Sequence, residues 1–140
     1  MVFADTSALF AFLVADDRHH PDAVRAETGL RAQREILWTI DPALTELWLL
    51  LRRETNRVLS DQLIAGLLDR GLRREPLQPE SYTRAWGLAR EWPDQDFSLT
   101  DRQAFAAIEH SRRHRAWSYD DDFAVIRLGP RRSRSLDLVR

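Results

Sequence analysis

The first dozen residues set the strongest limit on how this chain can fold. Residues 2–4 are apolar, Asp5, Thr6 and Ser7 follow, and a second apolar run covers residues 8–13. A short apolar run, a polar turn and a longer apolar run are typical of a strand that leads directly into a helix. Asp5 would then lie at the carboxyl end of the strand, which is the edge where ligands bind in α/β sheets.

The same alternation continues along the chain. Further strands are expected at 36–40, 116–119 and 136–139, and residues 76–79 are expected to form an edge strand or a loop. Helix patterns cover 8–13, 21–30, 41–56, 60–70, 81–91, 98–113 and 121–128. Strands that alternate with helices predict an α/β fold with a parallel sheet covered by helices. A chain of 140 residues is expected to form a single domain, 1–140.

Several local features complete this expectation. Asp41 is expected to cap the helix that Pro42 opens. The residues expected to face the core are Tyr82, Ala85, Trp86 and Ala89 in the helix over 81–91, and Phe123, Val125 and Ile126 in the short helix near the C-terminus. Leu49 and Leu50 widen the apolar face of their helix. This width predicts a second neighbour, which is ordinary core, a second copy of the chain or a protein partner.

The composition excludes several classes of active site. All 21 basic residues are arginine, so the chain has no Walker-type phosphate lysine and no Schiff-base lysine. The absence of cysteine excludes thiol nucleophiles and zinc-thiolate sites. Arginine suits bidentate phosphate contacts, although a bias in genomic base composition also explains its use. No segment approaches the ~20 apolar residues of a membrane span and no signal-peptide pattern is present, so a cytoplasmic protein is expected.

Two acids fall in phase with apolar helix stripes. Glu46 lies on the side of its helix that is expected to be buried, and Asp101 has Ala104 and Phe105 at its i+3 and i+4 positions. Charged side chains normally lie on the outer face of a helix. The placement of these two acids therefore calls for a specific partner.

Two more acids are expected at the same edge of the sheet, because Asp5 and Asp120 each follow a short apolar strand. Each acid also has a local explanation: Asp101 completes a capping box with Ser98, and Asp5 and Asp120 can cap helices. Together with Glu46, however, four carboxylates would share one site, and like charges raise one another's pKa. A divalent cation such as Mg²⁺ or Mn²⁺ is the expected partner.

Four motifs appear in order along almost the whole chain. They are Phe3-Ala4-Asp5-Thr6-Ser7-Ala8-Leu9, Leu44-Thr45-Glu46-Leu47, Asp96-Phe97-Ser98-Leu99-Thr100-Asp101 and Tyr119-Asp120-Asp121-Asp122-Phe123. This set resembles the PIN-domain ribonucleases, in particular the VapC-like toxins of bacterial toxin-antitoxin pairs. The resemblance implies a PIN-like three-layer fold in which helices flank a central parallel sheet of about five strands. It also implies a catalytic Mg²⁺ or Mn²⁺ site formed by Asp5, Glu46, Asp101 and Asp120.

The resemblance further implies auxiliary roles for Ser7, Asp96 and Thr100. The three consecutive aspartates stand where relatives often have one aspartate followed by mixed residues. Asp122 is therefore the alternative to Asp120 as the fourth acid, and Asp120 is preferred because it lies closest to the end of the strand.

The expected reaction is hydrolysis of an RNA phosphodiester bond by a metal-activated water. Arg102, Arg112 and Arg113 are expected to bind the RNA, or else to form an ordinary solvated face. The family also implies an antitoxin protein as partner, and the apolar excess of residues 47–51 is compatible with binding such a partner or with a homodimer. A haloacid-dehalogenase-type phosphatase is excluded, because it needs a second aspartate where Ser7 stands and a lysine. The competing interpretation is a catalytically inactive PIN-fold interaction module.

Overall fold

The structure, a computed structural model, describes residues 1–140. Five strands form one sheet in the order β3-β2-β1-β4-β5, and all neighbouring strands are parallel. The strands are β1 (Val2–Ala4), β2 (Leu37–Ile40), β3 (Arg73–Glu75), β4 (Arg115–Trp117) and β5 (Asp137–Val139). The predicted α/β fold with a central parallel sheet is confirmed.

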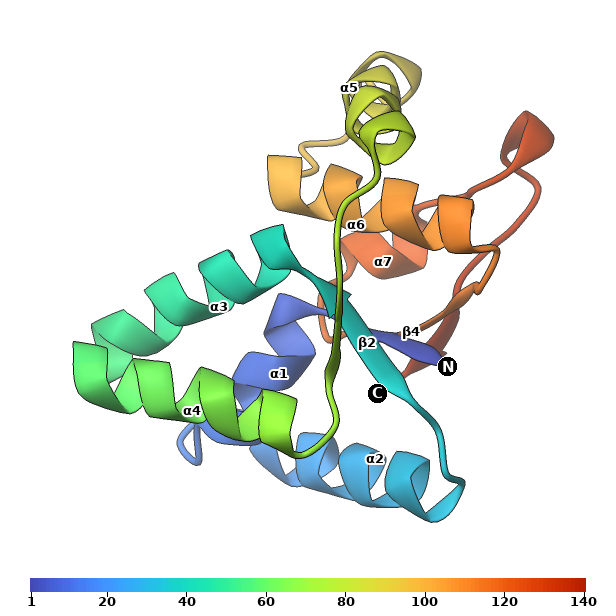
Figure 1. Ribbon diagram of the computed structural model, residues 1–140. Coiled ribbons are helices and arrows are strands. Elements are labelled where there is room, and N and C mark those ends of the chain that lie inside the picture. Colours follow the sequence, from blue (N-terminus) through green and yellow to red (C-terminus); the bar gives the residue numbers. More distant parts are fainter.

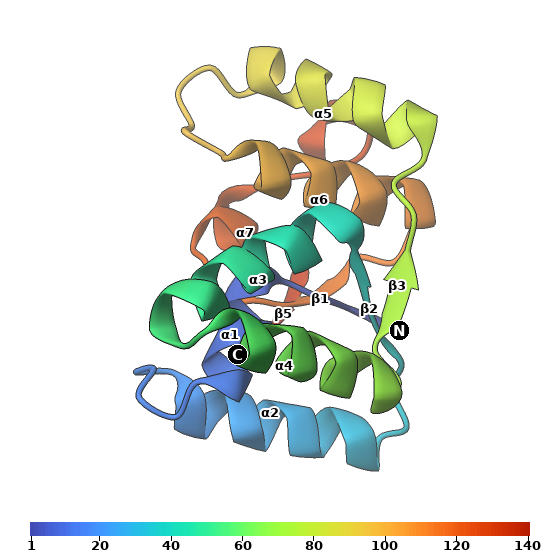
Figure 2. The same cartoon turned by 60° about the vertical axis from the view of Figure 1, so that its left-hand side comes forward.

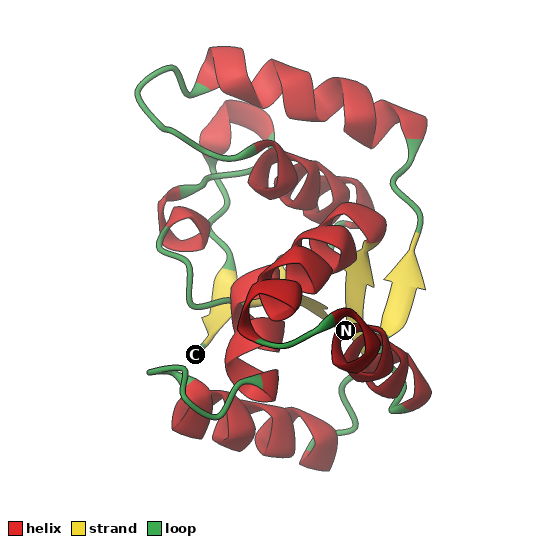
Figure 3. Ribbon diagram, turned by 90° about the vertical axis from the view of Figure 1, so that its left-hand side faces the viewer, coloured by secondary structure: helices red, strands yellow, loops and turns green.

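Helices cover both faces of the sheet (Figures 1 to 3). They are α1 (Thr6–Leu13), α2 (His20–Ala32), α3 (Asp41–Glu54), α4 (Arg57–Asp69), α5 (Pro79–Glu91), α6 (Leu99–Ser111) and α7 (Asp122–Val125), with a short 3-10 helix at Pro130–Arg132. The layer of α5, α6 and α7 covers one face, and α1, α2 and α4 lie on the other side (Figure 1). Helix α3 starts directly after β2 and packs against α1 and α4. None of the helices combines the length and apolar character needed to cross a membrane.

Each face of the sheet has its own hydrophobic core, because successive residues of a strand point to opposite faces. Phe3 belongs to the core under α5, α6 and α7, where its ring lies 5.0 Å from Trp38 and 6.2 Å from Phe123 between centroids. Val2 and Ala4 belong to the core under α1 to α4. Burying a large apolar side chain contributes about 1.5–3 kcal/mol. The central strand β1 is therefore apolar on both faces, and the carboxyl ends of the parallel strands form one edge of the sheet.

Several helices begin a few residues earlier than predicted, and the caps of two helices differ from the prediction. Asp41 does not cap α3 but lies in its first turn, and its carboxylate pairs with Arg74 of β3 at 3.2 Å. Helix α4 begins three residues earlier than expected, because the Asn56 side chain accepts a hydrogen bond of 2.9 Å from the Leu59 N–H. Asparagine is a strong N-cap residue. This cap therefore separates α3 from α4 directly.

For residues 76–79 the prediction was an edge strand or a loop, and the loop is confirmed. The edge strand β3, which lies just before this segment, was not predicted. Strand β3 covers Arg73–Glu75, and the expected segment 76–79 is a loop that runs into the first residue of α5. β3 pairs only with β2, and its two arginines are exposed. Charged edge strands prevent pairing with other chains, but they lack the apolar pattern by which strands are recognised.

Several side chains that were expected to face the core are exposed. They are Tyr82, Trp86 and Ala89 of α5, and Val125 of α7. Helix α5 packs mainly on α6, so it buries only the narrow stripe that includes Ala85 and Leu88. Phe123 and Ile126 are buried, as predicted. Leu49 is 51% exposed, so it does not belong to the core of this chain.

Candidate metal centre

Asp5 lies at the carboxyl end of β1 and caps α1. Its Oδ2 accepts hydrogen bonds from the Ser7 backbone N–H (3.1 Å), the Ser7 hydroxyl (2.5 Å) and the Ser118 hydroxyl (2.9 Å). The register of the sheet explains the third bond, because Ala4 of β1 pairs with Trp117 of β4 and the next residues lie side by side. All three bonds end on one oxygen, which leaves Oδ1 available to a ligand.

Burial dominates the chemistry of Asp5. The side chain is almost inaccessible, and removal from water raises its pKa from 3.8 to about 6. The hydrogen bonds from Ser7 and Ser118 oppose this change, and the nearby charge of Asp101 adds to it. Near neutral pH, Asp5 is therefore an ionised carboxylate in a place that favours the neutral form.

Glu46 approaches the same edge from α3. Its Oε2 accepts a hydrogen bond of 3.0 Å from the Thr6 hydroxyl, which fixes the side chain against the start of α1. The carboxylate is half-buried, and burial is the main cause that raises its pKa. The charges of Asp101 and Asp120 raise the pKa further. Glu46 therefore lies within electrostatic reach of both aspartates.

Asp101 lies in the first turn of α6 and forms the capping box that its sequence predicts. Its N–H donates to the Ser98 hydroxyl at 3.0 Å, and its Oδ2 accepts from the Ser98 N–H at 2.9 Å. The carboxylate also faces Asp120, and burial together with that charge raises its pKa. The capping role and the site role are thus compatible, because the cap engages one carboxylate oxygen.

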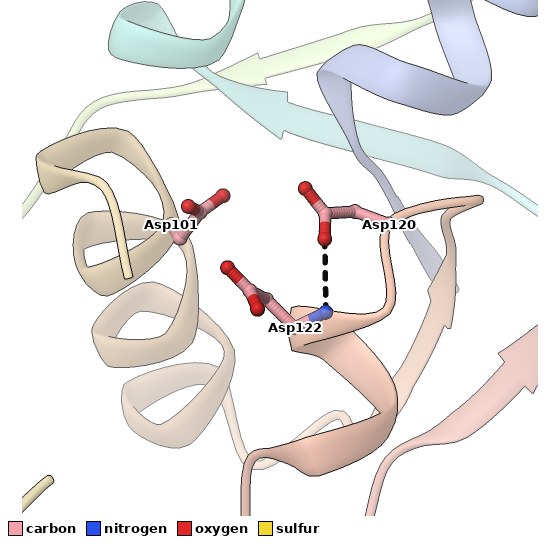
Figure 4. A group of neighbouring side chains, drawn as sticks. All are labelled: Asp101, Asp120 and Asp122. Carbon is pink, nitrogen blue, oxygen red and sulfur yellow. Dashed lines mark hydrogen bonds between the residues drawn. The ribbon is translucent and has the colours of Figure 1, made fainter. Parts of the chain in front are cut away.

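Asp120 and Asp122 complete a group of three acids that we call the acidic trio: Asp101, Asp120 and Asp122. One oxygen from each carboxylate lies within 4.8 Å of the others. Figure 4 shows the three side chains turned toward one another, from α6, from the loop after β4 and from the start of α7. Asp120 also accepts a hydrogen bond of 2.8 Å from the Asp122 N–H, so it caps the backbone that enters α7.

The five acids at this edge have no basic partner. The ion pairs of the protein engage other carboxylates and none of these five. The pKa of Asp122 is raised by burial and then by Asp120 and Asp101. Carboxylate oxygens are the ligands that Mg²⁺ and Mn²⁺ prefer. The donor set therefore fits a hard divalent cation, which would offset the repulsion among the acids.

The predicted site residues take three kinds of position. Asp101 and Asp120 meet in the acidic trio, together with Asp122, which the sequence offered only as an alternative. Asp5 and Glu46 lie outside this closest group, but the charge of Asp101 raises the pKa of both. The auxiliary Ser7 binds Asp5 directly, as described above.

The other two auxiliary residues make weaker contacts with the site. Asp96 is exposed in the loop before α6, and its charge contributes to raising the pKa of Asp122. Thr100 is half-buried but takes no part in the hydrogen bonds that hold Asp101, which come from Ser98.

The three arginines expected to bind RNA are not grouped. Arg102 follows Asp101 directly, and its guanidinium lies over the Trp86 ring at 5.5 Å from the centroid. Arg112 caps the C-terminus of α6 and Arg113 follows it, both exposed. At 1.5 Å of rise per residue, these two lie roughly 16 Å along the helix from Asp101. Arg102 alone lies beside the acids.

Two hydroxyl residues of the site were missed in the sequence. Ser118 bonds Asp5, contacts the Ser7 hydroxyl at 3.2 Å and accepts a hydrogen bond from the Asp120 N–H at 3.1 Å. Thr6 holds Glu46. The sequence places Ser118 at the end of a strand, but its contact with Asp5 depends on the pairing of β1 with β4. The signal for Thr6 was only its place beside Asp5.

Comparison with known proteins agrees with this geometry. No curated protein matches the sequence. A solved structure of Mycobacterium tuberculosis VapC20, described as a sarcin-ricin loop cleaving toxin, is similar with a TM-score of 0.76 and 25% sequence identity. The similarity covers 87% of this chain and 92% of the VapC20 chain. Residues 2–128 match the PIN domain family. The chain belongs to the PIN domain family.

Proposed function

We propose that this protein is a metal-dependent endoribonuclease and the toxin of a type II toxin-antitoxin pair. The observation that carries this proposal is the acidic trio, whose oxygens lie within 4.8 Å of one another without a basic partner. Family membership and the similarity to VapC20, which is described as a sarcin-ricin loop cleaving toxin, support the same conclusion.

The proposed ligands of the cation are Asp5, Glu46, Asp101 and Asp120, with Asp122 beside them. When bound, Mg²⁺ or Mn²⁺ would lower the pKa of a coordinated water and offset the charge of the phosphate. The ligand set contains no histidine or cysteine, which fits a hard cation held by oxygen. No histidine is needed as a general base in this scheme.

The remaining residues of the site hold the acids in place. Ser7 and Ser118 fix the orientation of Asp5, Ser98 fixes Asp101 and Thr6 fixes Glu46. Such partners restrict each carboxylate to one orientation before the substrate arrives. Glu46, fixed by Thr6, would hold the cation or orient the attacking water.

The proposed partners are RNA, a cognate antitoxin protein and a second copy of the chain. Arg102 is the arginine best placed to meet the RNA backbone near the acids. Arg112 and Arg113 would meet only a longer or folded RNA, because they lie at the far end of α6. The exposed Leu49 of α3 belongs to the surface on which a protein partner or a second copy is proposed to bind.

The direct test is cleavage of total RNA by the purified protein with Mg²⁺, with Mn²⁺ and with chelator. Discrete fragments are expected with metal, and none with chelator or with Asp101→Asn. Asparagine keeps an oxygen that can accept from the Ser98 N–H, so the variant should fold. Expression of the wild-type protein should also slow bacterial growth, whereas Asp101→Asn should not. Failure to bind Mn²⁺ or to cleave any RNA would favour the inactive interaction module instead.

A further inference from the structure

A hollow of about 460 Å³ lies beside the candidate metal centre. Two residues of that centre, Ser7 and Asp120, also line the hollow. We call it the His19 hollow, after the histidine in its wall. Its volume falls within the range of about 300–1,000 Å³ that is typical of small-molecule sites. A group bound there would lie next to whatever the acids hold.

The apolar part of the hollow continues the helix faces that carry the acids. Phe10 lies three residues after Ser7 on α1, and Leu50 lies four residues after Glu46 on α3. Residues at these spacings are neighbours on one face of a helix. The hollow therefore has an apolar part that is formed by α1 and α3.

Another part of the lining is a pair of stacked rings. The His19 and Tyr119 rings lie 4.6 Å apart between centroids and are tilted by only 10°. The backbone N–H of His19 donates to the Asp17 carboxylate at 2.8 Å, and Arg18 Nε donates to His19 Nε2 of the ring at 3.0 Å. The turn after α1 thus fixes the imidazole on Tyr119. Tyr119 in turn immediately precedes Asp120, so the rings are tied to the acids by the chain itself.

We infer that the His19 hollow binds one unpaired nucleobase of the RNA, next to the phosphodiester bond that is cleaved at the acidic site. This inference rests on the proposed function. A flat aromatic ring matches both the apolar wall and the stacked rings, whereas a phosphate would be repelled by Asp17 and Asp120. Arg18 lies at the rim, where it can meet the backbone of the same nucleotide.

The test combines a protein variant with a modified substrate. The cut position is first mapped on a single-stranded oligoribonucleotide, and abasic nucleotides are then placed one at a time on either side of it. Removing the recognised base should lower kcat/KM roughly 5- to 150-fold, which corresponds to the about 1–3 kcal/mol that stacking of a base on an aromatic side chain contributes. His19→Ala should lower kcat/KM for the intact substrate by a similar factor. The abasic penalty should disappear in that variant.

Further variants separate stacking from folding. His19→Phe keeps a flat ring and should retain most of the activity and the abasic penalty. Tyr82→Ala removes an exposed aromatic ring on α5, and it should behave as wild type. Mn²⁺ binding measured by calorimetry should be unchanged in His19→Ala, which shows that the acids are intact.

Two results would overturn the inference, and they differ from each other. If the wild-type protein cleaves with metal and Asp101→Asn does not, but the abasic penalty is the same in His19→Ala, the hollow does not bind a base. If the wild-type protein cleaves no RNA under any metal condition, the proposed function fails and the inference fails with it.

Discussion

Two clusters of acids in this protein lie in opposite electrostatic surroundings. Between α5 and α6, Glu109 accepts hydrogen bonds from Arg84 at 2.6 Å and from the Gly129 N–H at 2.7 Å. Burial alone would raise the pKa of Glu109, but these partners outweigh it and hold the pKa below its usual range. At the carboxyl edge of the sheet, burial raises the pKa of Asp5 and Asp101, and no basic side chain pairs with them.

The two clusters differ in whether a basic side chain balances the charge of the acids. A carboxylate whose pKa is lowered by an ion pair in the folded protein increases the free energy of unfolding at neutral pH. Buried acids without a partner repel one another and oppose folding. A cluster of the second kind is therefore maintained at a cost in stability, which a bound cation would relieve.

The largest expected effect is on catalysis. Asp5→Asn, Asp101→Asn and Asp120→Asn should each lower kcat/KM for RNA by more than the roughly 100-fold that loss of a ligand's outer partner costs. Asp122→Asn tests whether Asp122 also serves as a ligand: a loss of kcat/KM as large as that of Asp120→Asn would show that both acids are needed. The matched control is Asp137→Asn, an exposed acid on β5 that pairs with Arg115 away from the site. If the Asp5→Asn variant and the Asp101→Asn variant both cleave RNA at nearly the wild-type rate, the assignment of these acids as metal ligands is wrong.

The opposite effect is expected in the paired cluster. Glu109→Gln removes one charged partner of Arg84, although Glu91 remains paired with it at 2.5 Å. The free energy of unfolding should fall by about 1–2 kcal/mol, because hydrogen bonds to charged groups are lost. RNA cleavage should stay near the wild-type rate at temperatures where the variant is folded. Denaturant unfolding measures the first quantity, and unchanged stability would show that the pair contributes nothing.

The pH dependence of stability should show the unpaired acids directly. The pKa of Asp5 is about 6 in the folded protein, against 3.8 for an unperturbed aspartate. Between these values the folded state binds more protons than the unfolded state, so stability falls as the pH rises. From pH 5 to pH 7 this group should cost the metal-free protein about 1 kcal/mol.

Asp5→Asn serves as the control for this measurement, because asparagine does not titrate. The free energy of unfolding should decline less between pH 5 and pH 7 in the variant than in the wild type, when both are measured by denaturant unfolding in a buffer that contains chelator. Saturating Mn²⁺ should stabilise the wild-type protein most at the upper end of this range, where the acids are ionised. An equal decline in both proteins would show that Asp5 is not the source.

The smallest expected effect separates the arginines. Arg102→Ala should lower kcat/KM about two- to fivefold, as expected for an exposed charge near a phosphate. Arg112→Ala should change it less on a short oligoribonucleotide, because Arg112 lies at the other end of α6. The difference should shrink at high salt. A larger effect of Arg112→Ala would place the RNA along the whole length of α6.

The sequence predicted those parts of the molecule that follow from local pattern. The parallel sheet and the position of Asp5 followed from short apolar runs that alternate with helices. The capping box of Asp101 was also visible, and the structure shows that the same side chain serves the acidic trio. Phe123 was expected in the core for the same reason, and it is buried.

The failures occurred where tertiary context decides. Trp86 has the spacing of a core residue but is 50% exposed, because α5 is an outer helix that packs mainly on α6. Strand β3 lies at an edge and needs no apolar residues. Ser118 reaches Asp5 only through the register between β1 and β4, which no local pattern reports. The closeness of Asp122 to Asp101 likewise depends on how α7 meets α6 (Figure 4).

Calorimetric titration of the metal-free protein with Mn²⁺ tests the central claim most directly. We predict saturable binding near neutral pH that weakens as the pH falls below 6, because Asp5 must lose its proton to bind. Binding should be lost in Asp101→Asn and kept in Glu109→Gln. The absence of saturable binding by the wild-type protein, or equal binding by Asp101→Asn, would contradict the claim that these acids form a cation site.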